Sequence, residues 1–171
     1  MKQVIIVEYD RAWPAAFEEF RRRLWPAIAD AAESIEHVGS TAVPGLAAKP
    51  IIDMTIVVPA PAAMTTVIDR LAGLGYRHQG DRGMAGREAF DNPPGAPAHH
   101  LYAAVRGNLG LRNHQAIRDH LRRHPAAARA YGELKKELAA RFPNDINAYI
   151  EGKTRFLSKI LAQEGLTQAE P

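Results

Sequence analysis

The spacing of apolar residues predicts a chain that mixes strands with helices up to about residue 110 and is helical after it. Residues 3–8 are rich in β-branched side chains and predict a short strand. The segment after Asp10 predicts a helix, because its apolar residues recur at intervals of three and four. Those residues are Phe17, Phe20, Leu24, Ile28 and Ala31. Pro26 lies within the pattern, so we expect the helix to kink or divide there.

Residues 35–58, IEHVGSTAVPGLAAKPIIDMTIVV, form the most informative stretch of the chain. They predict a short strand ending at His37, a tight turn at Gly39 and Ser40, and a long apolar strand that carries Asp53. A carboxylate in a strand rich in Ile and Val is costly to bury unless it has a partner. We therefore expect Asp53 to meet a hydrogen-bond network, a metal or a substrate.

The remaining pattern supplies the other elements of the fold. It predicts a helix from about residue 61 with Met64, Val67, Ile68 and Leu71 buried, strands around Tyr76, at 87–90 and at 99–105, and helices at about 112–124, 126–142 and 146–162. We expect the polar tail, residues 165–171, to fray. The pattern thus predicts an α+β fold, a mixed sheet with flanking helices and a helical C-terminal third. We expect one domain over 1–171, with the sheet at about 1–110 and the last helices at about 111–163.

Composition narrows the class of protein. The chain has 171 residues, of which 46% are hydrophobic and 24% charged, as in ordinary globular proteins. It contains no cysteine, which excludes disulfides, thiolate metal sites and cysteine nucleophiles. No stretch approaches the roughly 20 apolar residues of a membrane span, and the first apolar run is too short for a signal peptide. We expect a cytoplasmic protein without membrane partners.

The modest net charge of +3 is concentrated in residues 112–124, RNHQAIRDHLRRH. Four arginines and three histidines there accompany only one acid, Asp119. This segment is either a phosphate-attracting patch or a solvated helix face. Nucleic-acid binding through it is the weaker hypothesis, because aromatic residues make up only 7% of the chain and leave few platforms for base stacking.

The Gly39-Ser40 turn is the first candidate for anion binding. The backbone N–H groups of such a turn, and the serine hydroxyl, can face a phosphate. Strand alternation places Asp53 and Thr55 on one face of the sheet, with Asp53 directed toward the turn. The alternative is that Asp53 caps nearby backbone.

The central stretch, IEHVGSTAVPGLAAKPIIDM, resembles the signature of the GrpB family. The segments VEYDRAWPAAF, GREAF, HHL, IRDHLRRHPAAARAYGELKKELA and the pair Tyr149 and Lys153 also resemble that family, so the likeness covers about residues 4–161. The GrpB family is similar in turn to the nucleotidyltransferase superfamily. Members of that superfamily carry a Gly-Ser turn, a strand with two acids two residues apart, and a third acid on a later strand. The resemblance implies a nucleotidyltransferase-like fold that binds a nucleotide or another phosphorylated small molecule.

The resemblance places the metal ligands only in part. Asp53 matches the first acid of the pair, but Thr55 stands where the second is expected, and His99 and His100 lie where the third is expected. Magnesium prefers oxygen ligands, whereas manganese accepts histidine. A Mg or Mn ion at Asp53 and His100 is therefore what the resemblance implies.

The resemblance also implies the residues of a ligand site. Asp53 and Ser40 are the candidate catalytic residues, and the candidate binding residues are Gly39, Ser40, His37, Lys49, Arg87, Arg118, Lys135 and Lys153. Each basic residue has the alternative of a surface or salt-bridge position, above all Arg118 beside Asp119. An enzyme should place a further carboxylate near Asp53, from Glu36, Asp81 or Glu88.

Two classes of function follow from this resemblance. The first is metal-dependent nucleotidyl transfer. The second is a non-catalytic binding or regulatory module on the same fold, with a coenzyme A-linked or folding-helper role, because GrpB-like domains occur fused to dephospho-coenzyme A kinase. The sequence leaves the oligomeric state open.

Overall fold

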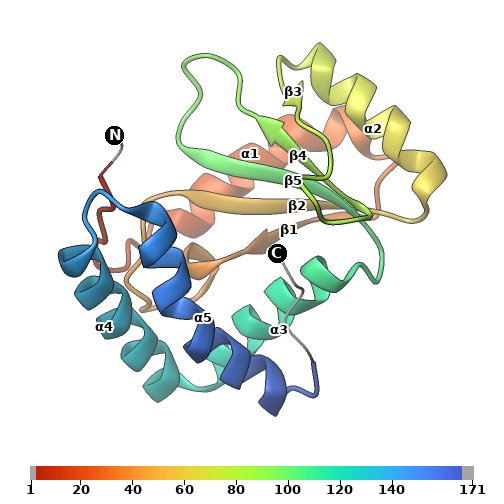
Figure 1. The fold of residues 1–171 in the computed structure, drawn as a ribbon. Coiled ribbons are helices and arrows are strands. Elements are labelled where there is room, and N and C mark those ends of the chain that lie inside the picture. Colours follow the sequence, from red (N-terminus) through yellow and green to blue (C-terminus); the bar gives the residue numbers. More distant parts are fainter. Residues whose placement is uncertain (1–2, 167–171) are drawn as a thin grey trace.

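A computed structural model describes residues 3–166 (Figure 1). Its elements, in chain order, are α1 (Trp13–Ile28), β1 (Ser34–Val38), the 3₁₀ turn η1 (Ser40–Ala42), β2 (Ile52–Val58), α2 (Pro61–Gly73), β3 (Arg77–His78), β4 (Arg87–Asp91), β5 (His99–Val105), α3 (Leu109–Arg123), α4 (Pro125–Arg141) and α5 (Ile146–Gln163). The α+β class predicted from the sequence is confirmed.

The five strands form one mixed sheet in the order β1-β2-β5-β4-β3. Strands β2 and β5 run parallel, and the other neighbours are antiparallel. The register sets Val38 opposite Asp53 across β1 and β2, and Asp53 opposite His100 across β2 and β5. The ends of three strands therefore meet at the position of Asp53.

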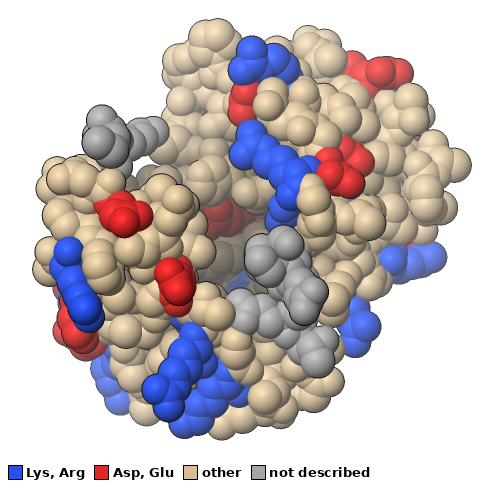
Figure 2. Space-filling model, in the orientation of Figure 1, with Lys and Arg blue, Asp and Glu red and all other residues tan. Residues whose placement is uncertain are grey.

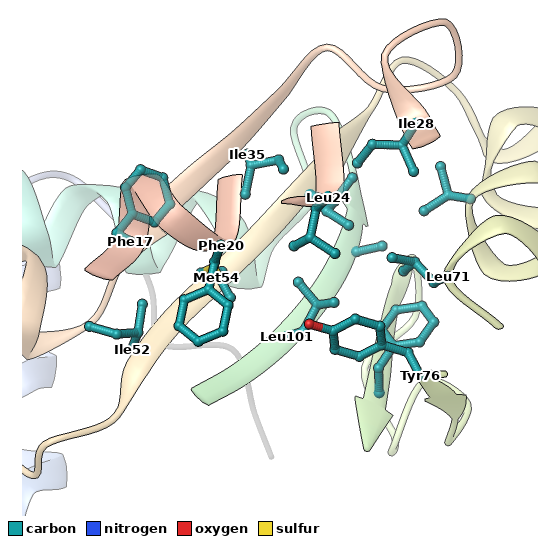
Figure 3. Packing of buried hydrophobic residues seen from close by; sticks show 14 of the residues in the cluster. Phe17, Phe20, Leu24, Ile28, Ile35, Ile52, Met54, Leu71, Tyr76 and Leu101 are labelled. Carbon is teal, nitrogen blue, oxygen red and sulfur yellow. The ribbon is translucent and has the colours of Figure 1, made fainter. Parts of the chain in front are cut away.

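One face of the sheet carries the main hydrophobic core, beneath α1 and α2 (Figure 3). Alternate residues of β2 point into it, and Met54 and Ile56 are fully buried there. The apolar face of α1 supplies Phe17, Phe20 and Leu24 to the same cluster. The packing of this layer against β2 fixes the position of the residues on the other face of the strand.

Helices α3, α4 and α5 lie on the opposite side of the sheet (Figure 1). Leu111 of α3 packs on β2 and β5 in a small cluster. A second cluster joins α3, α4 and α5 to the loop after the Gly-Ser turn through Val43 and Leu46. The loop and the helices are thus packed as a unit beside the sheet.

The structure corrects three expectations about elements. Residues 3–8 form no strand; their contact with the loop before β2 is the isolated bridge of Val7 with Ala48. Pro26 does not divide α1, which continues past it for two residues and ends at Ile28; the proline lacks one N–H of the helix ladder, and little helix follows it. Helix α3 begins at Leu109, before the predicted start, because the Asn108 side chain caps it by accepting a hydrogen bond from the Leu111 N–H.

Two further expectations concern the C-terminal tail and membrane-spanning helices. The predicted fraying of the tail lies, from residue 167 onward, outside the described residues. Between residues 3 and 166, the structure contains no helix with the length and apolarity that crossing a membrane requires.

The burial of Ile56 of β2 in the core can be tested with Ile56→Ala. Ile56 has no exposed surface, so its truncation is expected to lower the free energy of unfolding by about 2–5 kcal/mol in urea denaturation. Leu74→Ala, at a side chain that is 41% exposed, is the control and should change it by less than about 0.5 kcal/mol. Equal losses in the two variants would contradict this placement of the core.

Candidate functional site

The Gly39-Ser40 turn is built against Asp53. Gly39 has φ 72°, a conformation that glycine adopts without strain. A Cβ at this position would collide with the carboxylate of Asp53. The turn therefore requires glycine both for its positive φ and for the space beside Asp53. The predicted approach of Asp53 to the turn is confirmed.

Asp53 has a direct partner on the neighbouring strand. Its Oδ1 lies 2.7 Å from Nδ1 of His100, which faces it in the parallel register. The partner expected for this carboxylate is thus a histidine. Both side chains remain partly exposed at the sheet edge, so the pair borders open space.

A cleft lies between this sheet edge and α3, α4 and α5, and Figure 2 shows the surface hollowed between the two parts of the molecule. Its volume is about 260 Å³. Asp53 is the one carboxylate among the described residues that line it. The lining includes Gly39, Ser40, Lys49, Asp53, His100, His114, Arg118, Tyr131, Lys135, Tyr149 and Lys153. The cleft brings together eight of the ten residues predicted for the site or its metal, and His37 and Arg87 lie outside it.

Two lysines reach the cleft from helices in the same way. Lys135 of α4 lies 4.7 Å from the ring centroid of Tyr131, and Lys153 of α5 lies 4.5 Å from that of Tyr149. Each lysine follows its tyrosine by four residues, one helical turn. The Tyr149 ring also lies 5.9 Å from Nζ of Lys49. Cations and aromatic faces therefore alternate along the side of the cleft formed by α4 and α5, the helical wall.

Lys135 joins this wall to the turn. Its Nζ donates a hydrogen bond to Oγ of Ser40 at 2.8 Å, and the residue is only 2% exposed. Burial, reinforced by the charge of Lys153, lowers the pKa of Lys135 to about 7. Burial, followed by the charge of Lys49, lowers the pKa of Lys153 to about 8. The cleft thus holds ammonium groups that solvent does not stabilise.

Two of the predicted binding residues lie outside the cleft. His37 points to the other face of the sheet, where it stacks on Phe17 and its Nε2 lies 3.0 Å from Oγ1 of Thr41. Burial lowers the pKa of His37 to about 4. Arg87 shares the sheet face of Asp53, but its guanidinium lies over the ring of Tyr102 at 4.7 Å. Neither side chain lines the cleft.

Arg118 borders the cleft but has protein partners. Its guanidinium donates to Glu36 at 2.9 Å, to the His37 carbonyl at 3.1 Å and to Asp119 at 2.7 Å. The alternative of an ion pair with Asp119 is thus what the structure shows for Arg118. Arg118 fastens α3 to β1.

The carboxylates expected near Asp53 are engaged elsewhere. Glu36 shares the sheet face of Asp53 but pairs with Arg118. Glu88 lies on the other face and pairs with His78 at 2.6 Å, while Asp81 accepts a hydrogen bond from the Gly83 N–H in an exposed loop. No second carboxylate among the described residues joins Asp53 in the cleft.

The donor set does not match a two-metal centre. Within residues 3–166, no group of three His, Asp or Glu side chains is arranged to hold a metal ion. Thr55 is buried, and His99 points into the core, where its Nε2 lies 2.9 Å from the hydroxyl of Tyr76. Asp53 and His100 are adjacent, as a shared metal would require, but are hydrogen-bonded to each other.

The basic segment 112–124 is mostly occupied by contacts within the protein. Besides Arg118, Arg122 donates to the Ala42 carbonyl at 2.8 Å, and Arg123 pairs with Glu164 at 2.7 Å. His120 also contacts Glu164, at 2.7 Å. These contacts leave fewer of the segment's donors free for a phosphate.

Besides aliphatic side chains, sequence reasoning missed one histidine and two tyrosines of the cleft. Tyr131 and Tyr149 are core positions by helical spacing, and His114 belongs to the basic segment, yet all three line the cleft. Burial lowers the pKa of His114. The repeated spacing of tyrosine and lysine on α4 and α5 is the signal that identifies the two tyrosines.

The burial of Lys135 predicts a pH dependence of stability. Between about pH 7 and pH 10, Lys135 has lost its proton in the folded state but keeps it when unfolded. The unfolded state then binds more protons, so the free energy of unfolding should rise with pH, by at most about 1.4 kcal/mol per unit from this residue. Urea denaturation at pH 7, 8 and 9 measures the slope.

The matched variants are Lys135→Met and Lys136→Met on the same helix. The first is expected to flatten the slope, with a residual contribution from Lys153. The second should keep the wild-type slope, because Lys136 lies outside and pairs with Glu133 and Glu8. An unchanged slope in Lys135→Met would refute the assignment.

Known proteins show similarity over nearly the whole chain. The chain is 38% identical to the UPF0157 protein YqkA of Bacillus subtilis over 156 residues, which are 91% of this chain and 46% of that protein. It is 29% identical to a dephospho-CoA kinase of Mycolicibacterium paratuberculosis, covering 88% of this chain and 43% of the kinase. This chain thus spans about half the length of YqkA.

Solved structures agree on the fold. The crystal structure of conserved protein GrpB from Enterococcus faecalis matches with a TM-score of 0.82 and 36% identity, covering 91% of this chain and 94% of that chain. The MgGTP-bound Cid1 poly(U) polymerase matches with a TM-score of 0.52 and 17% identity, over 80% of this chain and 45% of that one. The latter likeness shows a nucleotidyltransferase-like fold. The family model for the GrpB protein matches residues 3–163, and the chain belongs to the GrpB family.

Proposed function

We propose that this protein binds the phosphate group of a nucleotide, or of another phosphorylated small molecule, in the cleft between the sheet edge and α3, α4 and α5. One observation carries the proposal: three lysines, Lys49, Lys135 and Lys153, line a cleft whose one carboxylate among the described residues is Asp53. None of the three forms an ion pair within the described part of the chain.

A buried ammonium group without a counterion is costly to the fold. The nearest groups to Lys135 are a neutral hydroxyl and an aromatic ring, neither of which neutralises its charge. A phosphate would supply that charge and accept hydrogen bonds from several donors at once. The Ser40 hydroxyl and the turn lie beside the same lysine and fit the same ligand.

The remainder of the ligand has space next to the cleft. A pocket of about 560 Å³ adjoins it and shares Lys49, Ile51 and His100 with its lining. Its other walls are largely aliphatic, with Val4, Ile5, Pro50, Ala98 and Ile146. A phosphate ester with a larger organic group fits this arrangement better than free phosphate does.

Two refinements stay predictions at this point. Nucleotidyl transfer with Mg or Mn is supported by the shared fold, but Thr55 replaces the second acid of the superfamily pattern. A coenzyme A-linked binding role is supported by the similarity to a dephospho-CoA kinase. Both place the phosphate in the same cleft.

The proposal can be tested with Lys153→Met and its matched control, Lys159→Met, on the same helix. Lys153 lines the cleft, whereas Lys159 is exposed on α5. Titration calorimetry with pyrophosphate and with ATP is expected to show binding to the wild type, weakened about tenfold or more in Lys153→Met. Lys159→Met removes the same charge and should bind as the wild type does.

Two results would contradict the proposal. One is the absence of binding of both probes by the wild type, and the other is an equal loss in the two variants. Release of pyrophosphate from ATP in the same samples would favour the enzyme over the binding module.

A further inference from the structure

The cleft offers a divalent ion few ligands. Asp53 is its one carboxylate within the described chain, and Oδ1 of that carboxylate already faces Nδ1 of His100 at 2.7 Å. The position two residues along β2 is Thr55, a neutral and buried side chain. Magnesium bound by protein generally uses one or two carboxylates together with the phosphates of its substrate. Here at most one is available.

Two further acids, Glu36 on this sheet face and Asp119 on α3, are neutralised by an arginine. Glu36 and Asp119 both pair with Arg118, whose side chain is only 12% exposed. Releasing either acid to a metal would leave a poorly solvated guanidinium without its partner, which is costly. The structure therefore holds these carboxylates away from the cleft.

The cations of the cleft would also repel a metal ion. Burial and then the charge of Lys153 lower the pKa of Lys135, and burial and then the charge of Lys49 lower the pKa of Lys153, so positive charge is already disfavoured in the cleft. A doubly charged ion near Asp53 would add to this repulsion. A phosphate anion would relieve it.

We propose that the cleft binds its phosphate ligand without a divalent ion, with Lys49, Lys135 and Lys153 supplying the charge that magnesium supplies in metal-dependent phosphoryl transfer. This inference rests on the proposed phosphate binding. Lys135 and the turn hold the phosphate from one side, and Lys153 and Lys49 hold it from the wall around Tyr149.

Asp53 then has the opposite role from a metal ligand. Its carboxylate shapes the turn by lying against Gly39 and holds His100, but its negative charge opposes the incoming phosphate. Asp53→Asn keeps the shape and a hydrogen-bonding oxygen while removing the charge. The two roles therefore predict changes of opposite sign in anion affinity.

The experiment is titration calorimetry of the full chain with pyrophosphate and with ATP, in EDTA, in Mg²⁺ and in Mn²⁺. Wild-type affinity in EDTA is expected to equal or exceed that in either metal, because the metal complexes carry less negative charge. Asp53→Asn is expected to bind about threefold more tightly in EDTA, the effect of removing one nearby charge at high effective dielectric.

Binding that requires Mg²⁺ or Mn²⁺, or loss of binding in a folded Asp53→Asn, would overturn the inference while leaving phosphate binding in place. No binding in any condition would overturn both. Circular dichroism checks the fold of the variant, and His100→Gln is the second variant should Asp53→Asn not fold. If binding is metal-free, His100→Gln should bind equally well in EDTA and in Mn²⁺. If His100 is a metal ligand, the wild type should bind only in Mn²⁺, and His100→Gln should lose that binding.

Discussion

The contact of the Asp53 carboxylate with the Gly39 turn is the constraint on which the site depends. The antiparallel register of β1 and β2 brings Val38 opposite Asp53, so the chain must reverse directly over the carboxylate. Only a residue without a Cβ fits there. The same turn presents Ser40 to Lys135 of α4. The contact between Asp53 and Gly39 thus positions the turn relative to both the sheet and Lys135 of α4.

The molecule offsets the cost of the cleft in its packing. Ammonium groups held in a poorly solvated cleft destabilise the folded state. The apolar layer of α1 and α2 beneath β2, and the cluster that joins α3, α4 and α5 to the loop at Val43 and Leu46, supply the opposing stability. Arg118 adds a polar clasp between α3 and β1. The apolar packing and the Arg118 contacts therefore hold both walls of the cleft in place.

The helical wall repeats one local device. On α4 and on α5, a lysine follows a tyrosine by one turn and lies over its ring. The rings replace water around the aliphatic part of each lysine, and their faces favour the cation. The tyrosines lie at positions whose helical spacing predicts core residues, and the lysines that follow them carry the positive charge of the site.

The sequence by itself determined most of the elements and half of the site. Periodicity identified α1, β2 and the last helices, because burial on one face leaves a repeat of 3.6 or 2 residues. The Gly-Ser turn and the acid on the next strand followed from local backbone chemistry. The prediction of a strand at residues 3–8 was wrong, because β-branched residues also suit an extended segment that has no neighbouring strand to pair with.

Only the tertiary structure decided which charged residues act together. Arg118 and Lys135 look alike as basic helical positions, yet Arg118 meets Glu36 across 82 residues of sequence and Lys135 meets a neutral serine across 95. Whether a cation is neutralised depends on what the fold places beside it, and no local pattern records that. The sequence therefore named the lysines, the arginine and the aspartate of the cleft, and the packing of α3, α4 and α5 against the sheet determined which of their charges remain for a ligand.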